Sequence, residues 1–379
     1  KRAVRRSFAV CILLSAAATV LLTAVSVVFA RPVLELLQTP PEILDAAHSY
    51  IIIIFWGIGA AMLFNLLSNV IRALGDSRTP LYFLVLACVL NIALDLALIL
   101  RFGMGPAGAA VATVVSQLVS GLLCTIYVFR KFPMLRLTRA DWNMSRRYLW
   151  AHIRLALPMG FQASIIAIGA ILVQFALNRL GAQAVAAFSA AQKIDMVATL
   201  PMMSFGIAMA TYVAQNYGAR NPLRIRQGVL QCSLMSVGFS IAVAVVNIIW
   251  GPELIRLFVG TGEREVVRLA QTYLNINASM YWVLALLFVF RYTLQGLGQS
   301  VVPTFAGVME LAMRAFAAII LARYLGFAGA SMASPAAWIG SCVPLAIAYF
   351  FTRKRLAQST KQPFPPCSGE ERESIRQAA

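Results

Sequence analysis

The sequence predicts an all-α, polytopic membrane protein. The chain has 379 residues, of which 60% are hydrophobic and only 12% are charged, whereas soluble proteins average about 25% charged residues. The apolar residues gather in ten runs, each long enough to cross the roughly 30 Å hydrocarbon core of a bilayer as a helix. Membrane barrels consist instead of alternating segments of about 10 residues. We therefore expect ten transmembrane helices in contact with a lipid bilayer.

The expected helices occupy residues 8–29, 48–71, 81–101, 105–129, 155–179, 184–213, 227–250, 269–291, 302–323 and 327–351. Each is bounded by charged residues or by Gly and Pro, which punctuate apolar runs. In chain order, the bounding segments include KRAVRR, RPVLELLQTPPE, RALGDSRTP, RFGMGP, RKFPMLRLTRADW, NRLGAQ, NYGARNPLRIR, GPELIRLFVGTGERE, LQGLGQSVVP and RYLG. The helices should therefore alternate in direction across the membrane.

The basic residues indicate how the helices are oriented. With the N-terminus inside, 23 of the 32 Lys and Arg residues, Arg291 among them, fall on the cytoplasmic side and seven fall outside. Cytoplasmic loops are enriched in Lys and Arg, so we expect both termini in the cytoplasm of a prokaryote and the chain in its cytoplasmic (inner) membrane. The net charge of +18 does not indicate a nucleic-acid partner, because the basic residues form short clusters with no recognition motif.

An internal repeat relates the two halves of the chain. RALGDSRTP at 72–80 matches QGLGQSVVP at 295–303, and GPAGA at 105–109 matches GFAGA at 326–330. RPVLELL at 31–37 and YVFRK at 127–131 also have later counterparts in the same order. The first four helices therefore correspond to the last four, as in transporters built from parallel repeats. Helices 155–179 and 184–213 have no earlier counterpart, which predicts two further N-terminal helices and twelve helices in the intact protein.

The repeat also predicts the domain organisation. We expect an N-terminal lobe at 1–131 that lacks its first two helices, a cytoplasmic linker at 132–150 and a C-terminal six-helix lobe at 151–355. The segment 356–379 is polar and rich in Pro, a composition typical of a disordered cytoplasmic tail.

Asn91 and Asp95 stand one turn apart within an apolar helix, where a carboxylate is costly. At about 1.5 Å per residue, Asp95 and Asn91 lie about 9 Å and 15 Å from the helix end near Arg101. Thr113 lies about 12 Å down the next helix, which a short connection makes an antiparallel neighbour. Oxygen ligands of this kind suit a hard cation such as Na+, and a buried Asp can instead carry a proton. Alternatively, Asp95 stays protonated and only hydrogen-bonds between helices.

Several longer stretches resemble one family of transporters. LGDSRTP, NIALD and RFGMGPAGAAVATVVSQ in the first half, and ALPMGFQASI, RLGAQAVAAFSAAQKID, VAQNYGARN and LQGLGQSVVPT in the second, resemble the multidrug and toxic compound extrusion (MATE) family. The resemblance covers nearly all of residues 1–355. It implies two six-helix bundles that export organic cations and other amphipathic drugs or metabolites in exchange for Na+ or H+.

The resemblance also implies a cation site. The family places an Asn, an Asp four residues later and a Thr on the next helix in its N-terminal lobe, and Asn91, Asp95 and Thr113 match this pattern. The family's site also uses an Asp on a first helix that this sequence does not contain. No other metal site, no cofactor and no partner chain are expected, so the protein should act as a monomer.

Other polar residues lie within expected helices and are candidates for a cavity or for coupling. They are Gln162, Gln174, Lys193, Asp195, Glu310 and Arg314. Glu310 and Arg314 stand four apart and should form an ion pair, either as a structural pair or as a lining of the cavity. The alternative function is a flippase for polyprenyl-linked lipid or polysaccharide precursors, which would need a more basic cavity. Motifs of a hydrolase or a metalloprotease are absent from the sequence, and we expect no enzyme.

Overall fold

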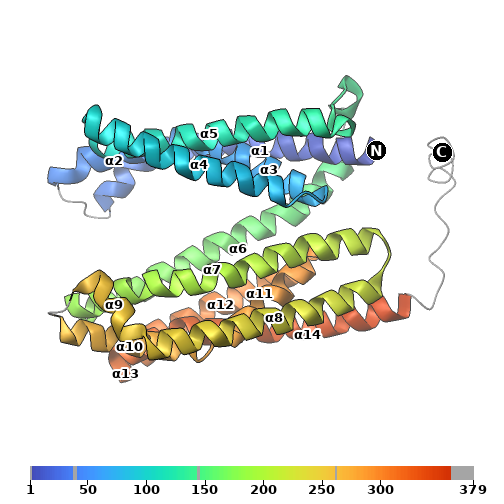
Figure 1. The fold of residues 1–379 in the computed structure, drawn as a ribbon. Coiled ribbons are helices and arrows are strands. Elements are labelled where there is room, and N and C mark those ends of the chain that lie inside the picture. Colours follow the sequence, from blue (N-terminus) through green and yellow to red (C-terminus); the bar gives the residue numbers. More distant parts are fainter. Residues whose placement is uncertain (1, 37–40, 143–145, 261–262, 360–379) are drawn as a thin grey trace. The chain divides into compact units, whose positions relative to one another are not determined.

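The computed structural model describes residues 2–36, 41–142, 146–260 and 263–359, and every regular element in these residues is a helix. The chain divides into two compact units, Lys1–His152 and Ile153–Ala379. Figure 1 shows each unit as a bundle of long helices. These observations confirm the predicted all-α fold class with two helical bundles.

The N-terminal unit is built from five long helices and several short turns. They are α1 (Arg2–Leu36), α2 (Pro41–Trp56), α3 (Ile58–Ala73), α4 (Arg78–Leu96) with the π-helical turn η1 (Ala97–Arg101), α5 (Gly105–Lys131), and the 3-10 turns η2 (Pro133–Leu135) and η3 (Arg139–Trp142). Helix α5 packs against α2, α3 and α4 and so forms the centre of this unit.

The C-terminal unit contains the remaining helices. They are α6 (Arg146–Arg179, which begins in the N-terminal unit), α7 (Ala182–Gly218), α8 (Pro222–Ile249), α9 (Gly251–Val259), α10 (Arg264–Ala278), α11 (Tyr281–Gly296), α12 (Val301–Phe316) with the π-helical turn η4 (Ala317–Leu321), α13 (Ala322–Ser331) and α14 (Ala333–Ser359). Helix α11 packs against α7, α8 and α14, and α12 packs against α14.

The number of membrane spans agrees with the prediction. Among the described residues, 8 helical segments are long and apolar enough to cross a membrane, and the count reaches 10 if each of two bent pairs is one span. The bent pairs are α2 with α3 and α10 with α11. The break expected near residue 326 is a kink within α13, where Gly326 has φ 57° and ψ −132°. The next span begins at Ala333. A chain with 8 to 10 such segments is a multi-pass membrane protein.

The internal repeat is visible in the backbone. The corresponding pairs α2–α3 and α10–α11 bend by 41° and 49°, and the corresponding helices α4 and α12 both end in a π-helical turn. Both halves also close a helix with the same turn, in which Asp76 N donates to Ile71 O and Gln299 N donates to Leu294 O. These bonds satisfy carbonyls that the helix end would leave unpaired.

Glycine is required at one position in each of the two repeated motifs, RALGDSRTP with QGLGQSVVP and GPAGA with GFAGA. Gly75 and Gly298 have φ values of +95° and +77°, a left-handed conformation that strains other residues. Gly108 and Gly329, from the GPAGA and GFAGA motifs, lie against the two π-helical turns. A Cβ atom would lie 3.2 Å from Leu98 Cβ at the first glycine and 2.1 Å from the Leu321 carbonyl oxygen at the second.

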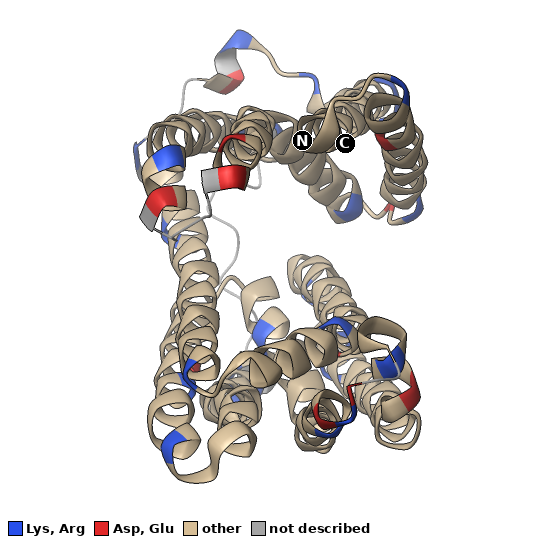
Figure 2. Ribbon diagram, turned by 90° about the vertical axis from the view of Figure 1, so that its left-hand side faces the viewer, with Lys and Arg blue, Asp and Glu red and all other residues tan. Residues whose placement is uncertain are grey.

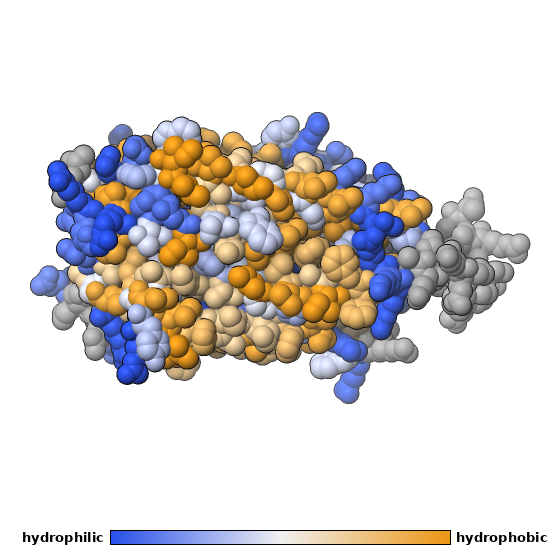
Figure 3. Space-filling model, turned by 90° about the horizontal axis from the view of Figure 1, so that it is seen from below, coloured by the Kyte–Doolittle hydropathy of each residue, from blue (hydrophilic) through white to orange (hydrophobic). Residues whose placement is uncertain are grey.

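The outer surface of the C-terminal unit is apolar between hydrophilic ends. Figure 3 shows hydrophobic residues over the middle of one face and hydrophilic residues towards both ends. Exposed apolar side chains on this unit include Leu230, Leu234, Met235 and Ile241 on α8 and Val343, Ile347 and Phe350 on α14. Figure 2 likewise shows few charged residues along most helices. Such a surface is stable in contact with lipid, whereas a soluble monomer rarely exposes large contiguous apolar patches.

The segment predicted as a linker contains regular structure where it is described. Its turn η3 packs on α1, where Arg5 Nε lies 3.4 Å from the buried Asp141 carboxylate. Tyr148 and Ser7 share a hydrogen bond of 2.7 Å between their hydroxyls, and α6 already begins at Arg146. At the other end, α14 continues to Ser359, so the first residues of the predicted tail are helical; residues 360–379 lie outside the described residues.

Candidate functional site

The predicted cation site brings together two adjacent helices of the N-terminal unit. Asn91 and Asp95 lie on α4, and Thr113 lies on α5, which packs against α4. Asn91 Nδ2 donates to Thr113 Oγ1 at 3.4 Å, and Thr113 Oγ1 donates to the Ala109 carbonyl at 2.9 Å. The Asn91 side-chain oxygen is therefore not used by this bond, and all three residues are partly buried.

Asp95 carries the most informative feature of this site. Its Oδ1 atom is buried, and it has no hydrogen-bond partner among the described residues. A buried carboxylate oxygen without a donor costs free energy in an apolar bundle. The residue stands just before η1, where the helix widens to π-helical geometry, and such turns are frequent at functional sites. The arrangement can accept a cation or a proton at Asp95.

A buried cluster of charges lies in the C-terminal unit. Glu310 Oε1 accepts from Arg314 at 3.1 Å, which confirms the predicted ion pair within α12. Glu310 Oε2 accepts from Arg291 on α11 at 2.7 Å. Arg291 also donates to Ser341 Oγ on α14 at 2.9 Å. The side chains of Arg291, Glu310 and Arg314 are only 7%, 5% and 14% exposed, so the cluster holds two cations for one carboxylate.

Arg291 corrects one sequence-based assignment. It was counted on the cytoplasmic side because helix 269–291 was expected to end there. Helix α11 instead continues to Gly296, which places Arg291 more than one turn inside the bundle. An Arg flanked by Phe290 and Tyr292 within an apolar run was a signal that this side chain has a buried partner.

Asp195 forms a second polar network. Tyr281 Oη on α11 donates to Asp195 Oδ1 on α7 at 2.6 Å, and Asn247 Nδ2 on α8 donates to Tyr281 Oη at 3.1 Å. Tyr281 is 0% and Asn247 is 3% exposed. The sequence identified Asp195 but not its two partners, because a Tyr and an Asn in apolar helices carry no pattern that names their contacts.

The remaining candidates are placed separately. Lys193 Nζ lies 5.3 Å from the centre of the Phe258 ring on α9, on a different side of α7 from Asp195, as expected for residues two apart. Gln162 is buried and accepts from Gln295 Nε2 at 3.4 Å. Gln174 donates to Asn178 on its own helix at 2.9 Å. The structure does not bring these three residues together.

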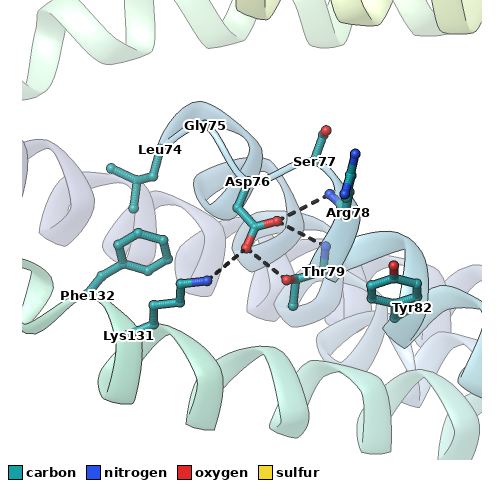
Figure 4. A pocket seen from close by; sticks show the side chains of 9 residues that line it. All are labelled: Leu74, Gly75, Asp76, Ser77, Arg78, Thr79, Tyr82, Lys131 and Phe132. Atoms are coloured by element: carbon teal, nitrogen blue, oxygen red, sulfur yellow. Dashed lines mark hydrogen bonds and ion pairs between the residues drawn. The ribbon is translucent and has the colours of Figure 1, made fainter.

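A hollow of about 620 Å³ surrounds the turn between α3 and α4 (Figure 4). Asp76 lies at its centre, where Tyr127 Oη donates to the carboxylate at 2.5 Å, Thr79 Oγ1 donates at 2.8 Å and Lys131 Nζ lies at 3.7 Å. The hydrogen bond from Tyr127, together with those from Thr79 and the charge of Lys131, holds the pKa of the Asp76 carboxyl well below its usual range. In the second half, Gln299 takes the equivalent place and donates to Thr352 Oγ1 at 3.2 Å. Asp76 therefore joins α4 to the end of α5.

Comparisons with known proteins agree with this architecture. The family model described as MatE matches residues 1–97 and 158–320. The probable multidrug resistance protein YpnP of Bacillus subtilis (strain 168) is 32% identical over 290 residues, which cover 74% of this chain and 63% of that protein. The chain thus spans less than two thirds of the length of that relative. The probable multidrug resistance protein YoeA of the same organism is 26% identical over 346 residues, or 89% of this chain and 74% of that protein.

A solved structure has the same fold. An outward-facing multidrug resistance MATE family transporter of the MOP superfamily superposes with a TM-score of 0.84 at 21% sequence identity. The match covers 94% of this chain and 84% of that chain. With the family model matched over most of both units, the chain belongs to the MatE family.

Proposed function

We propose that the protein is a secondary active exporter that exchanges organic cations or amphipathic drugs for Na+ or H+. The observation that carries this proposal is Asp95, whose buried Oδ1 has no donor among the described residues and lies on α4 with Asn91, beside Thr113 on α5. Membership of the MatE family and the names of its relatives support the substrate class. The coupling ion is a transported substrate, so neither a resident metal nor a cofactor enters the mechanism.

Asp95 provides the negative charge to which the coupling ion binds. A Na+ ion would take oxygen ligands from Asp95, Asn91 and Thr113, which are the ligand types that hard cations prefer. A proton would neutralise Asp95 instead and remove the cost of its burial. In either case, binding changes the charge inside the N-terminal bundle, and a ligand shifts a conformational equilibrium only through such differential stabilisation.

The orientation follows from the basic residues. Without Arg291, 22 Lys and Arg residues still lie on the N-terminal side against seven on the other, which supports two cytoplasmic termini in the inner membrane. We propose that the lobes are 1–131 and 151–355, with 132–150 as their cytoplasmic connection. We also propose that the protein acts as a monomer in the lipid bilayer, with small molecules as its only other partners.

Dye efflux from cells tests the proposal. Asp95→Asn keeps the shape of the side chain but removes the charge and the exchangeable proton, so we expect loss of efflux at unchanged protein level in the membrane. Asp45→Asn is the matched control, because Asp45 is exposed near the start of α2. Efflux in Asp95→Asn equal to that of the control would contradict the proposal.

A further inference from the structure

One intramembrane carboxylate of the C-terminal unit has no arginine or lysine partner. Among the described residues on the membrane-spanning helices of this unit, Glu265 is paired with Arg268 and Glu310 with two arginines. Asp195 has no cation within ion-pair distance among these described residues, and the hydrogen bond that it accepts there comes from the Tyr281 hydroxyl. A paired carboxylate is held ionised by its partner, whereas uptake of a proton by Asp195 breaks no ion pair of the described residues.

The hydrogen bonds to Asp195 form a directed chain across three helices. Asn247 on α8 donates to Tyr281 on α11, and Tyr281 donates to Asp195 on α7. Every donor in this chain points towards the carboxylate, which is the arrangement that stabilises the ionised form. Asp195 is partly buried, whereas Tyr281 and Asn247 are fully buried, so the carboxylate is the most accessible member of the hydrogen-bonded chain.

Tyr281 occupies a mechanically important position. It is the first residue of α11, directly after the 49° bend that separates α11 from α10. The hydrogen bond to Asp195 therefore fastens the bend to α7. Discontinuous helices commonly form the sites of transporters and move during transport. Pro201, six residues after Asp195, interrupts the hydrogen bonds of α7 on the same helix.

The charged and titratable groups around Asp195 are few. Tyr281 on α11 and Tyr273 on α10 are the acidic hydroxyls that interact with it, and Arg314 on α12 is the cation whose charge acts on it. Helix α8 contributes the neutral Asn247, and the charged residues of α9, Glu253 and Arg256, pair with each other. Arg314 contacts Glu310 directly, so it acts on Asp195 through its charge and not through an ion pair.

We propose that Asp195, with Tyr281 and Asn247, is a second proton-binding site that controls the bend between α10 and α11. A proton from water binds the carboxylate, and the hydrogen bond from Tyr281 then joins two neutral groups. Bonds to an ionised partner are roughly twice as strong as neutral ones, so protonation loosens the bend from α7. Protonation also removes a negative charge that acts on Arg314, which favours a different arrangement of the bundle.

Infrared titration of the purified chain tests this proposal directly. Protonated carboxylic acids have a carbonyl stretching band that carboxylates lack. We expect a band that grows as pH falls, is lost in Asp195→Asn and is retained in Asp95→Asn. In Tyr281→Phe the carboxylate loses the one donor that it has among the described residues, so the midpoint of this band should move to higher pH. The Asp95 variant distinguishes this site from the proposed coupling site, because the proposal for one site can be refuted while the proposal for the other holds.

Hydrogen exchange at constant pH measures the mechanical part. Asp195→Asn imitates the protonated state, and we expect faster amide exchange around residues 279–284 with no change in α14. A pH-dependent band that is the same in wild type and Asp195→Asn would overturn the proton site. If Asp195→Asn does not fold, an unshifted midpoint in Tyr281→Phe would overturn it equally. Unchanged exchange at the bend would overturn its control by Asp195.

Discussion

Replacing Glu310 by Gln should destabilise the C-terminal unit more than any other single change in its charge cluster. The substitution keeps the size of the side chain but removes the carboxylate that contacts both Arg291, at 2.7 Å, and Arg314, at 3.1 Å. Both arginines are largely buried, and their Nε atoms already lack partners in the described residues. The variant therefore contains two adjacent, unpaired guanidinium groups.

The distances set the expected magnitude. At an effective dielectric constant of about 20, unit charges at these separations attract by ~5–6 kcal/mol each, but burial cancels much of this gain. Removing one partner of a buried pair costs about 3–5 kcal/mol in measured cases, and we expect Glu310→Gln to lie at the upper end of that range. Arg314→Gln should cost less, because it leaves Glu310 and Arg291 as a neutral pair.

Double substitutions distinguish the two arginines. Glu310→Gln with Arg314→Gln leaves Arg291 buried and unpaired, so we expect little recovery. Glu310→Gln with Arg291→Gln leaves Arg314, which is more exposed and whose charge acts on Asp195, so recovery should be larger.

Free energies of unfolding in detergent micelles, measured by denaturant titration, provide the comparison. Arg268→Gln is the control, because its pair with Glu265 is exposed, and we expect no resolvable change. A loss below about 1 kcal/mol in Glu310→Gln, or full recovery in the double variant that retains Arg291, would refute the assignment of Arg291 as the principal partner.

Three further predictions concern local structure. Gly75→Ala should lower the free energy of unfolding by about 1–2 kcal/mol, because the φ of Gly75 is +95° and a left-handed backbone is costly for other residues. Gly238→Ala in α8 is the control and should not destabilise the protein, because a Cβ atom there meets open space. Equal effects of the two substitutions in thermal melts would contradict this prediction. Asp76 has a lowered pKa in the folded state, so its contribution to stability is present above the ordinary carboxyl pKa of about 4 and is lost as the pH falls below that value. In thermal melts recorded at a series of pH values, the wild type should lose stability below about pH 4. Asp76→Asn should not show this loss. Gly206→Val should weaken the packing of α7 on α11 by about 1–3 kcal/mol, since its Cβ atom would lie 2.4 Å from the Tyr292 ring, and unchanged unfolding would show that the helices adjust without cost.

The fold was accessible from the sequence because lipid imposes simple rules. Apolar length, bounding Gly and Pro, and the repeated RALGDSRTP and QGLGQSVVP segments each report on the backbone directly. The bends at Gly57 and near Met280 were not predicted, because an apolar run looks the same whether its helix is straight or broken. The π-helical turns were missed for the same reason, although Gly108 and Gly329 in the repeated motifs are the residues that accommodate them.

The candidate site was predicted only in part. Asn91 with Thr113, and Glu310 with Arg314, were accessible because each pair follows from helical spacing or from a short connection between helices. Arg291 with Glu310, and Tyr281 with Asp195, join residues 19 and 86 positions apart, and no local pattern encodes which helices meet. The sequence therefore shows that a charged residue lies within a membrane span, whereas the partner of that residue is seen only in the structure.

Substrate uptake into liposomes that contain only the purified protein tests the central proposal most directly. An inward-facing or outward-facing gradient of Na+ or of H+ is imposed separately, and transport of a fluorescent organic cation is recorded for wild type and Asp95→Asn. We predict that, in wild type, one of the two ion gradients drives transport of the dye against its own concentration gradient. Asp95→Asn should abolish this ion-driven transport. Gradient-driven transport that persists in Asp95→Asn would contradict the assignment of Asp95 as the coupling residue.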